Sequence, residues 1–132
     1  DDIGKAYEEI GKQLNVPVLK LRYMPREMSF KELQIRGKKA VIKFQFGKNI
    51  IRLVEISGYQ ETIDVHVSDR VIYDKVYNRQ LKQDIFLSKN ELENGQIEFG
   101  ASIKSDTAYY YFSGILSEEE FDKIVNEFYF AQ

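Results

Sequence analysis

Length, composition and charge place this chain among small globular domains. It has 132 residues, of which 43% are hydrophobic, so one domain can bury a core without support from a disulfide or a metal. The net charge is −2 and both signs are spread along the chain, which argues against nucleic acid or an anionic membrane as a partner. Cysteine is absent, which excludes thiol nucleophiles, disulfides and cysteine-bound metals.

Targeting signals are not recognisable in the sequence. The longest apolar run is far shorter than the roughly 20 residues that a bilayer-spanning helix requires. The chain opens with Asp1 and Asp2 rather than Met, which we interpret as a processed or trimmed product. We therefore expect membrane attachment only through a segment that this chain lacks.

The first predicted element is a helix over residues 2–14. Apolar residues recur there with helical spacing, and Asn15 and Pro17 end the pattern. The apolar residues are Ile3, Ala6, Tyr7, Ile10 and Leu14.

Strand-type alternation follows the helix. Residues 19–23 alternate apolar and basic side chains, and residues 28–36 form the next predicted strand. The alternation changes parity between Phe30 and Leu33, which predicts a β-bulge.

The clearest hairpin is predicted over residues 40–57, with its turn at 47–49. Its second strand, residues 50–56, is apolar on both faces apart from Arg52 and Glu55. Such a pattern predicts a central strand that is covered on both sides.

The middle of the chain gives weaker signals. Residues 62–68 alternate as a strand that contains His66, and residues 71–77 form another predicted strand. Residues 78–95 show only a short apolar run at 85–87, so no element is assigned there.

The last third predicts a strand at 96–104, an aromatic strand at 108–115 and a helix at 117–129. Ser117 followed by Glu120 predicts a capping box, in which the serine accepts from the helix and the glutamate reaches back to the Ser117 amide. The apolar stripe of this helix is Phe121, Ile124, Val125 and Phe128.

The order helix, strands, helix predicts an α+β fold and argues against a parallel, doubly wound sheet. We expect one domain over residues 1–132. Its single antiparallel sheet has about six to eight strands, can curve strongly, and packs against the N-terminal and the C-terminal helix.

Catalytic and metal-binding patterns are missing from the sequence. His66 is the only histidine and lies on the polar side of its strand, where Asp64 is its nearest acidic neighbour. No G-x-S-x-G motif supports a hydrolase, and no glycine-rich phosphate loop or calcium loop occurs. The sequence therefore predicts no catalytic residue, no metal site, no cofactor and a protein that is not an enzyme.

Tyrosine is the unusual feature, because the chain holds nine tyrosines and nine phenylalanines. In the aromatic strand one pair is expected to pack under the helices and the other to cover the open sheet face with its hydroxyls in water. An alternative interpretation is a binding surface, since exposed aromatic residues anchor many partners. Its candidate residues are Tyr109, Tyr111, Tyr73, Tyr77, Tyr59 and His66.

Two stretches resemble a bacterial family known as domain of unknown function 4367. The first is YYYFSGILSEEEF at Tyr109–Phe121, a strand that ends in glycine before a capped, glutamate-rich helix. The second is LRYMP at Leu21–Pro25, which is similar to an early strand of that family. The resemblance implies an extracytoplasmic domain of membrane-anchored proteins in Gram-positive bacteria, without known catalytic residues.

The functional hypothesis from sequence is a non-enzymatic extracytoplasmic domain, membrane-anchored or secreted, that senses a signal or binds a protein. The first alternative is a carrier of a small apolar ligand, held in a groove between the curved sheet and the helices. It requires a continuous apolar cavity of at least about 300 Å³. The remote alternative is a hydrolase that depends on His66.

Overall fold

The structure is a computed structural model that describes residues 1–58 and 71–131. Helix α1 (Asp2–Leu14) begins after Asp1, whose carboxylate accepts a hydrogen bond of 2.7 Å from the Gly4 amide. It ends at Asn15, which adopts the left-handed conformation that asparagine tolerates well. The helix expected over residues 2–14 is confirmed.

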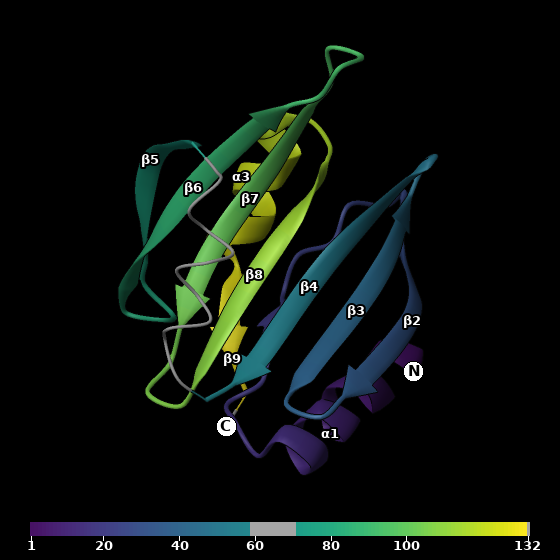
Figure 1. Ribbon diagram of the computed structural model, residues 1–132, viewed down its shortest axis with the longest axis vertical. Helices are drawn as coiled ribbons and strands as arrows, with labels where there is room; N and C mark the ends of the chain where they lie inside the picture. Colours follow the sequence, from purple (N-terminus) through teal and green to yellow (C-terminus); the bar gives the residue numbers. More distant parts are fainter. Residues whose placement is uncertain (59–70, 132) are drawn as a thin grey trace.

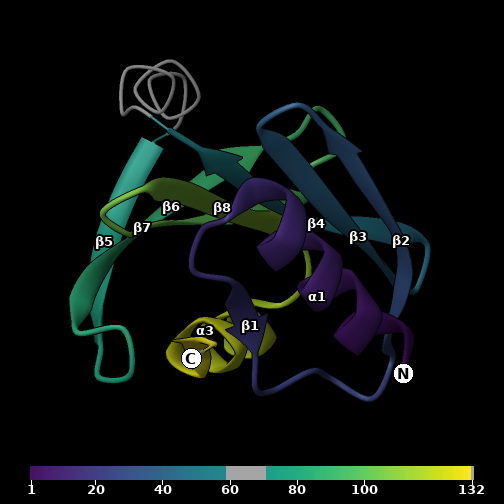
Figure 2. The ribbon, with the colours of Figure 1, turned by 90° about the horizontal axis from the view of Figure 1, so that it is seen from below.

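The main sheet is antiparallel throughout and, in the described part of the chain, has the strand order β2-β3-β4-β8-β7-β6-β5 (Figure 1). Its strands are β2 (Met28–Arg36), β3 (Lys39–Phe46), β4 (Asn49–Ser57), β5 (Val71–Asn78), β6 (Gln83–Glu91), β7 (Ile97–Lys104) and β8 (Ala108–Ile115). Figure 2 shows that the sheet arches over both helices, which lie inside its curve. The predicted α+β fold is thus confirmed.

A second, two-stranded sheet joins the two ends of the chain. It consists of β1 (Leu19–Leu21) and β9 (Phe128–Phe130), which follows helix α3 (Glu118–Asn126). The helix predicted over 117–129 is therefore too long, because Phe128 pairs with Leu21 in the small sheet. Pairing with a distant strand outweighs the helical spacing of that phenylalanine.

The hydrophobic core lies between the inner face of the sheet and the helices. Phe112 of β8 packs against Phe121 of α3 and Phe128 of β9, with ring centroids 6.1 and 5.3 Å apart. All three side chains are fully buried. Aromatic packing of this kind fixes α3 and β9 to the middle of the sheet.

Other expectations are met only in part. The predicted bulge lies between Phe30 and Glu32, as expected. Strand β4 is central, but only its inner face is fully covered, because Val54 and Ile56 are half-buried on the outer face. Strand β6 fills the stretch that had no assigned element, and Ile85 faces the core there.

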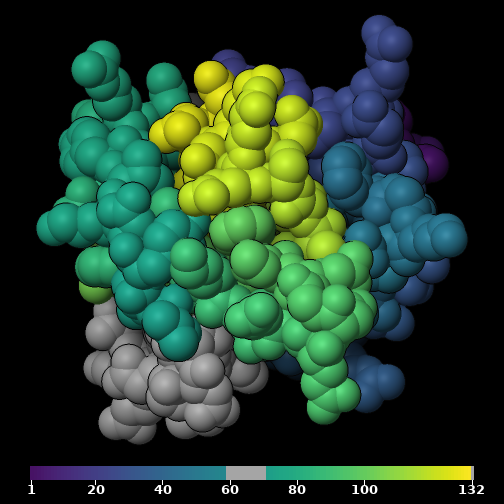
Figure 3. Space-filling model, turned by 90° about the horizontal axis from the view of Figure 1, so that it is seen from above, coloured from purple at the N-terminus to yellow at the C-terminus, as the bar shows by residue number. Residues whose placement is uncertain are grey.

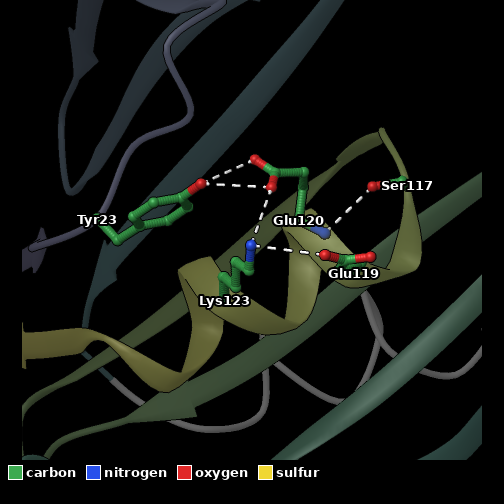
Figure 4. A network of polar contacts seen from close by, with 5 residues as sticks. All are labelled: Tyr23, Ser117, Glu119, Glu120 and Lys123. Atoms are coloured by element: carbon green, nitrogen blue, oxygen red, sulfur yellow. Dashed lines mark hydrogen bonds and ion pairs between the residues drawn. The ribbon is translucent and has the colours of Figure 1, made fainter.

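A polar cluster ties the segment after β1 to helix α3 (Figure 4). The Ser117 hydroxyl accepts a hydrogen bond of 3.1 Å from the Glu120 amide, which is half of the predicted capping box. The Glu120 carboxylate instead accepts from the Tyr23 hydroxyl at 3.0 Å and lies 3.7 Å from the Lys123 ammonium. The predicted hydrogen bond from the Ser117 amide to the Glu120 carboxylate is replaced by the hydrogen bond from the Tyr23 hydroxyl, which is distant in sequence.

Candidate functional site

The main candidate is a hollow of about 160 Å³ on the outer face of the sheet, which we call the outer hollow. Strands β4 and β8 pair there in register, so side chains opposite one another point to the same side. Val54 lies opposite Tyr111, and Ile56 lies opposite Tyr109. The full lining is Lys39, Arg52, Val54, Ile56, Tyr109, Tyr111 and Ser113.

The two tyrosines of the outer hollow lie flat over the neighbouring strands. The Tyr111 hydroxyl crosses Gly100 of β7 and lies 3.2 Å from the Ser88 hydroxyl of β6. The Tyr109 hydroxyl donates to Ser102 of β7 at 3.1 Å. Only 6% of Tyr111 and 3% of Tyr109 is exposed, so the expectation of hydroxyls in water is wrong. Small residues on β6 and β7 leave the room that these rings fill.

Positive charge surrounds the outer hollow. Lys39 and Arg52 are both exposed, and in the part of the chain that the structure describes neither forms an ion pair. Lys43, the cross-strand neighbour of Arg52, contacts Glu32 at 3.6 Å. Arg36 lies opposite Lys39 and adds a further cation. Cations that form no ion pair with another described residue are suited to hold an anionic group.

Tyr73 lies elsewhere, in a second hollow of about 170 Å³ between β5 and α3. Figure 3 shows the surface of α3 beside that of β5. Asp74, Glu118 and Asp122 make this hollow acidic. Burial is the largest cause that raises the pKa of Asp122, and the negative charges of Glu118 and Asp74 raise it further. Burial raises the pKa of Tyr73 to about 12, and its hydroxyl lacks a partner among the residues with described positions. Tyr73 therefore does not join the Tyr109 and Tyr111 pair.

Tyr77 is 57% exposed on the edge strand β5. Phe86 of the next strand is 46% exposed and shares the outer face, because it pairs with Ser102 and Ser102 pairs with Tyr111. Neither lines the outer hollow, because β7 separates β6 from β8, and β5 lies one strand further out. Tyr59, His66 and the strand predicted at 62–68 lie outside the described residues.

Glu55 is a buried carboxyl group on the inner face of β4, at 0% exposure. Its Oε1 accepts a hydrogen bond of 3.3 Å from the Leu19 amide, and its Oε2 has no partner among the described residues. Burial raises its pKa to about 8, although the bond from Leu19 opposes this shift. A carboxyl group in such a site stays protonated at neutral pH.

The reason for this buried carboxyl lies in β1. One edge of β1 pairs with β9, and the other edge faces side chains of α1 and β4 and pairs with no strand among the described residues. On that edge Glu55 accepts from the Leu19 amide, and the Tyr7 hydroxyl accepts from the Leu21 amide at 3.1 Å. Two side chains thus satisfy amides that would otherwise be buried without partners.

Sequence reasoning noted Arg52 and Glu55 only as exceptions in an apolar strand, and it placed neither of them, nor Lys39, in a site. Arg52 is the one charged side chain on the outward face of an otherwise apolar strand, and the sequence pattern alone could have marked it as a candidate site residue. Glu55 shares the parity of Ile51 and Leu53, so its inward direction was also readable.

Within residues 1–58 and 71–131 no group of three or more His, Cys, Asp or Glu side chains is placed to hold a metal ion. None of the helices in those ranges is long and apolar enough to cross a membrane. No family model, curated protein or solved structure matches this chain.

Proposed function

We propose that this chain is a non-enzymatic protein-interaction or sensing domain that binds its partner through the outer face of the sheet. The carrying observation is the outer hollow, where the exposed cations Lys39 and Arg52 flank apolar walls. Neither cation forms an ion pair with another residue of the described ranges, and exposed charges beside half-buried apolar residues are typical of recognition surfaces. Tyr109 and Tyr111 contribute rigid walls, because their hydroxyls are held by serines.

The interaction domain is favoured over a carrier of apolar ligands. Ring-to-ring packing of Phe112, Phe121 and Phe128 fills the inner face where a carrier would hold its ligand. The two larger hollows, of about 640 and 770 Å³, lie instead at one end of the sheet and share polar residues such as Ser105, Asp106 and Thr107. The hollow of about 640 Å³ mixes Leu14, Val16 and Ala108 with these polar residues, so neither hollow is the continuous apolar cavity that a carrier requires.

The proposed location is outside the cytoplasm, in a membrane-anchored or secreted bacterial protein. The support is the cysteine-free sequence and the resemblance carried by Tyr109–Phe121. Sequencing the gene upstream of Asp1 tests this part. A signal peptide or a membrane anchor is expected, and an open reading frame with neither would contradict it.

Site-specific photo-crosslinking tests the interaction surface. A benzophenone amino acid replaces Val54 in the outer hollow or, as the control, the exposed Glu8 of α1. In cells that produce the protein, we expect a discrete crosslinked product from position 54 and none from position 8. The product from position 54 should fade when Arg52→Glu is added. Equal products from both positions, or none from position 54, would argue against the proposed surface.

A further inference from the structure

The outer hollow has one positive group at each end and an apolar middle. Along β4, Arg52 and Ile56 are four residues apart, which corresponds to about 13 Å in a strand. Lys39 lies directly opposite Ile56 on β3, so its ammonium group marks the end remote from Arg52. Val54 lies halfway between, beside the ring of Tyr111.

An extended peptide has the same spacing. Alternate residues of an extended chain point to one side, and residues i and i+4 are also about 13 Å apart. A segment with acidic residues at i and i+4 and an apolar residue at i+2 therefore places two carboxylates and one apolar side chain on one face. That pattern complements the sequence of charges along the outer hollow.

We propose that the outer hollow binds an extended acidic segment of a partner protein, with carboxylates at Lys39 and Arg52 and an apolar side chain over Val54. This inference rests on the proposed function and specifies the chemistry of the partner. Arg52 can hold a carboxylate with two parallel hydrogen bonds, whereas Lys39 supplies a single point charge. The apolar middle selects against a segment that is only acidic.

The charges are exposed, so the expected complex is weak and depends on salt. Ion pairs in water are screened over about 8 Å at physiological ionic strength. We expect reversal of one cation to weaken binding by about fivefold to tenfold, because an attraction becomes a repulsion. Raising the salt concentration should weaken the wild-type complex and leave the reversed variants little affected.

The test is fluorescence anisotropy with three labelled peptides. The heptapeptide GESLSEG carries the proposed pattern, the heptapeptide GQSLSQG removes both charges, and the hexapeptide GESLEG shortens the spacing between the glutamates by one residue. The protein variants are Arg52→Glu, Lys39→Glu and the matched charge reversal Lys5→Glu on α1, where the side chain is exposed and remote from the sheet's outer face. Circular dichroism of each variant checks that it is folded.

The expected result is saturable binding of GESLSEG, weaker binding of the other two peptides, and loss of affinity in the Arg52→Glu and Lys39→Glu variants only. Arg52→Glu should in turn prefer GKSLSEG or GESLSKG over GESLSEG, and the preferred peptide reveals the direction in which the segment lies. Absence of saturable binding, equal binding of GQSLSQG, or an equal effect of Lys5→Glu would overturn the inference. If crosslinking at position 54 succeeds while GESLSEG fails to bind, the interaction surface stands and the acidic segment does not.

Discussion

Removing the buried carboxyl of Glu55 should change how the stability of this domain depends on pH. In the folded state its pKa is about 8, whereas an unperturbed glutamate has 4.5. Between these values the folded state keeps a proton that the unfolded state has released. Since the folded state binds more protons, the free energy of unfolding falls as pH rises from 4.5 to 8.

The size of the effect follows from the same two values. One unit of pKa difference corresponds to about 1.36 kcal/mol. The difference of 3.5 between 4.5 and 8 therefore lowers the free energy of unfolding by about 5 kcal/mol once the pH is above both values. At pH 7, which is 2.5 units above 4.5, the free energy of unfolding has already fallen by about 3 kcal/mol. This is a large share of the 5–15 kcal/mol that is typical of a whole domain.

The variant Glu55→Gln removes the titration and keeps an oxygen that can accept from the Leu19 amide. We expect urea unfolding, followed by circular dichroism, to give similar stabilities for both proteins at pH 5. At pH 8 the variant should be more stable by several kcal/mol, on the order of 4. Glu8→Gln on the exposed side of α1 is the matched control and should follow the wild type.

All other titrating groups are common to the wild type and Glu55→Gln, so their contributions cancel in the difference between the two stabilities. A stability difference between wild type and Glu55→Gln that stays constant from pH 5 to pH 8 would refute the reasoning. It would mean that Glu55 titrates alike in the folded and unfolded states.

Substitutions at three further positions test a close packing contact, a helix cap and a buried hydrogen bond. Gly100→Ala adds a methyl group that would meet the Tyr111 hydroxyl, so we expect the melting temperature to fall by about 4 °C. Without that contact alanine would stabilise the strand relative to glycine, so a rise in melting temperature would show that the Tyr111 ring does not lie over Gly100. Ser117→Ala removes the cap that accepts from the Glu120 amide and should cost about 1 kcal/mol in urea unfolding, whereas Ser117→Asp should restore most of it. Tyr7→Phe leaves a buried amide of β1 without its acceptor, and we expect a loss of about 1–3 kcal/mol; an unchanged stability would mean that this amide finds another partner.

Local patterns predicted most of the elements. Helix α1 carries its cap, its apolar stripe and its end signals within residues 1–17, so no distant contact is needed to recognise it. The bulge near Phe30 was readable from a change of parity alone. Strand β9 was misassigned because Phe128 fits a helical stripe equally well, and only the pairing with Leu21 decides between the two.

The candidate site depended on information that the sequence does not carry locally. Parity indicated that Tyr109 and Tyr111 share a face, but their neighbours follow from the pairing of β4 with β8, two strands far apart in the chain. The direction of the Tyr111 ring depends on Gly100 and Ser88, which lie on two further strands. The outer hollow is therefore a property of the assembled sheet.

The most direct test of the outer face as the binding surface is a titration of the ¹⁵N-labelled protein with GESLSEG, followed by amide chemical shifts in NMR spectra. The account predicts saturable shifts that cluster on β3, β4 and β8 around Lys39, Arg52 and Tyr111, while the amides of α1 stay unchanged. Shifts that concentrate on α1 or α3 would contradict the outer face as the binding surface, and spectra that do not change at millimolar peptide would contradict the acidic segment as its partner.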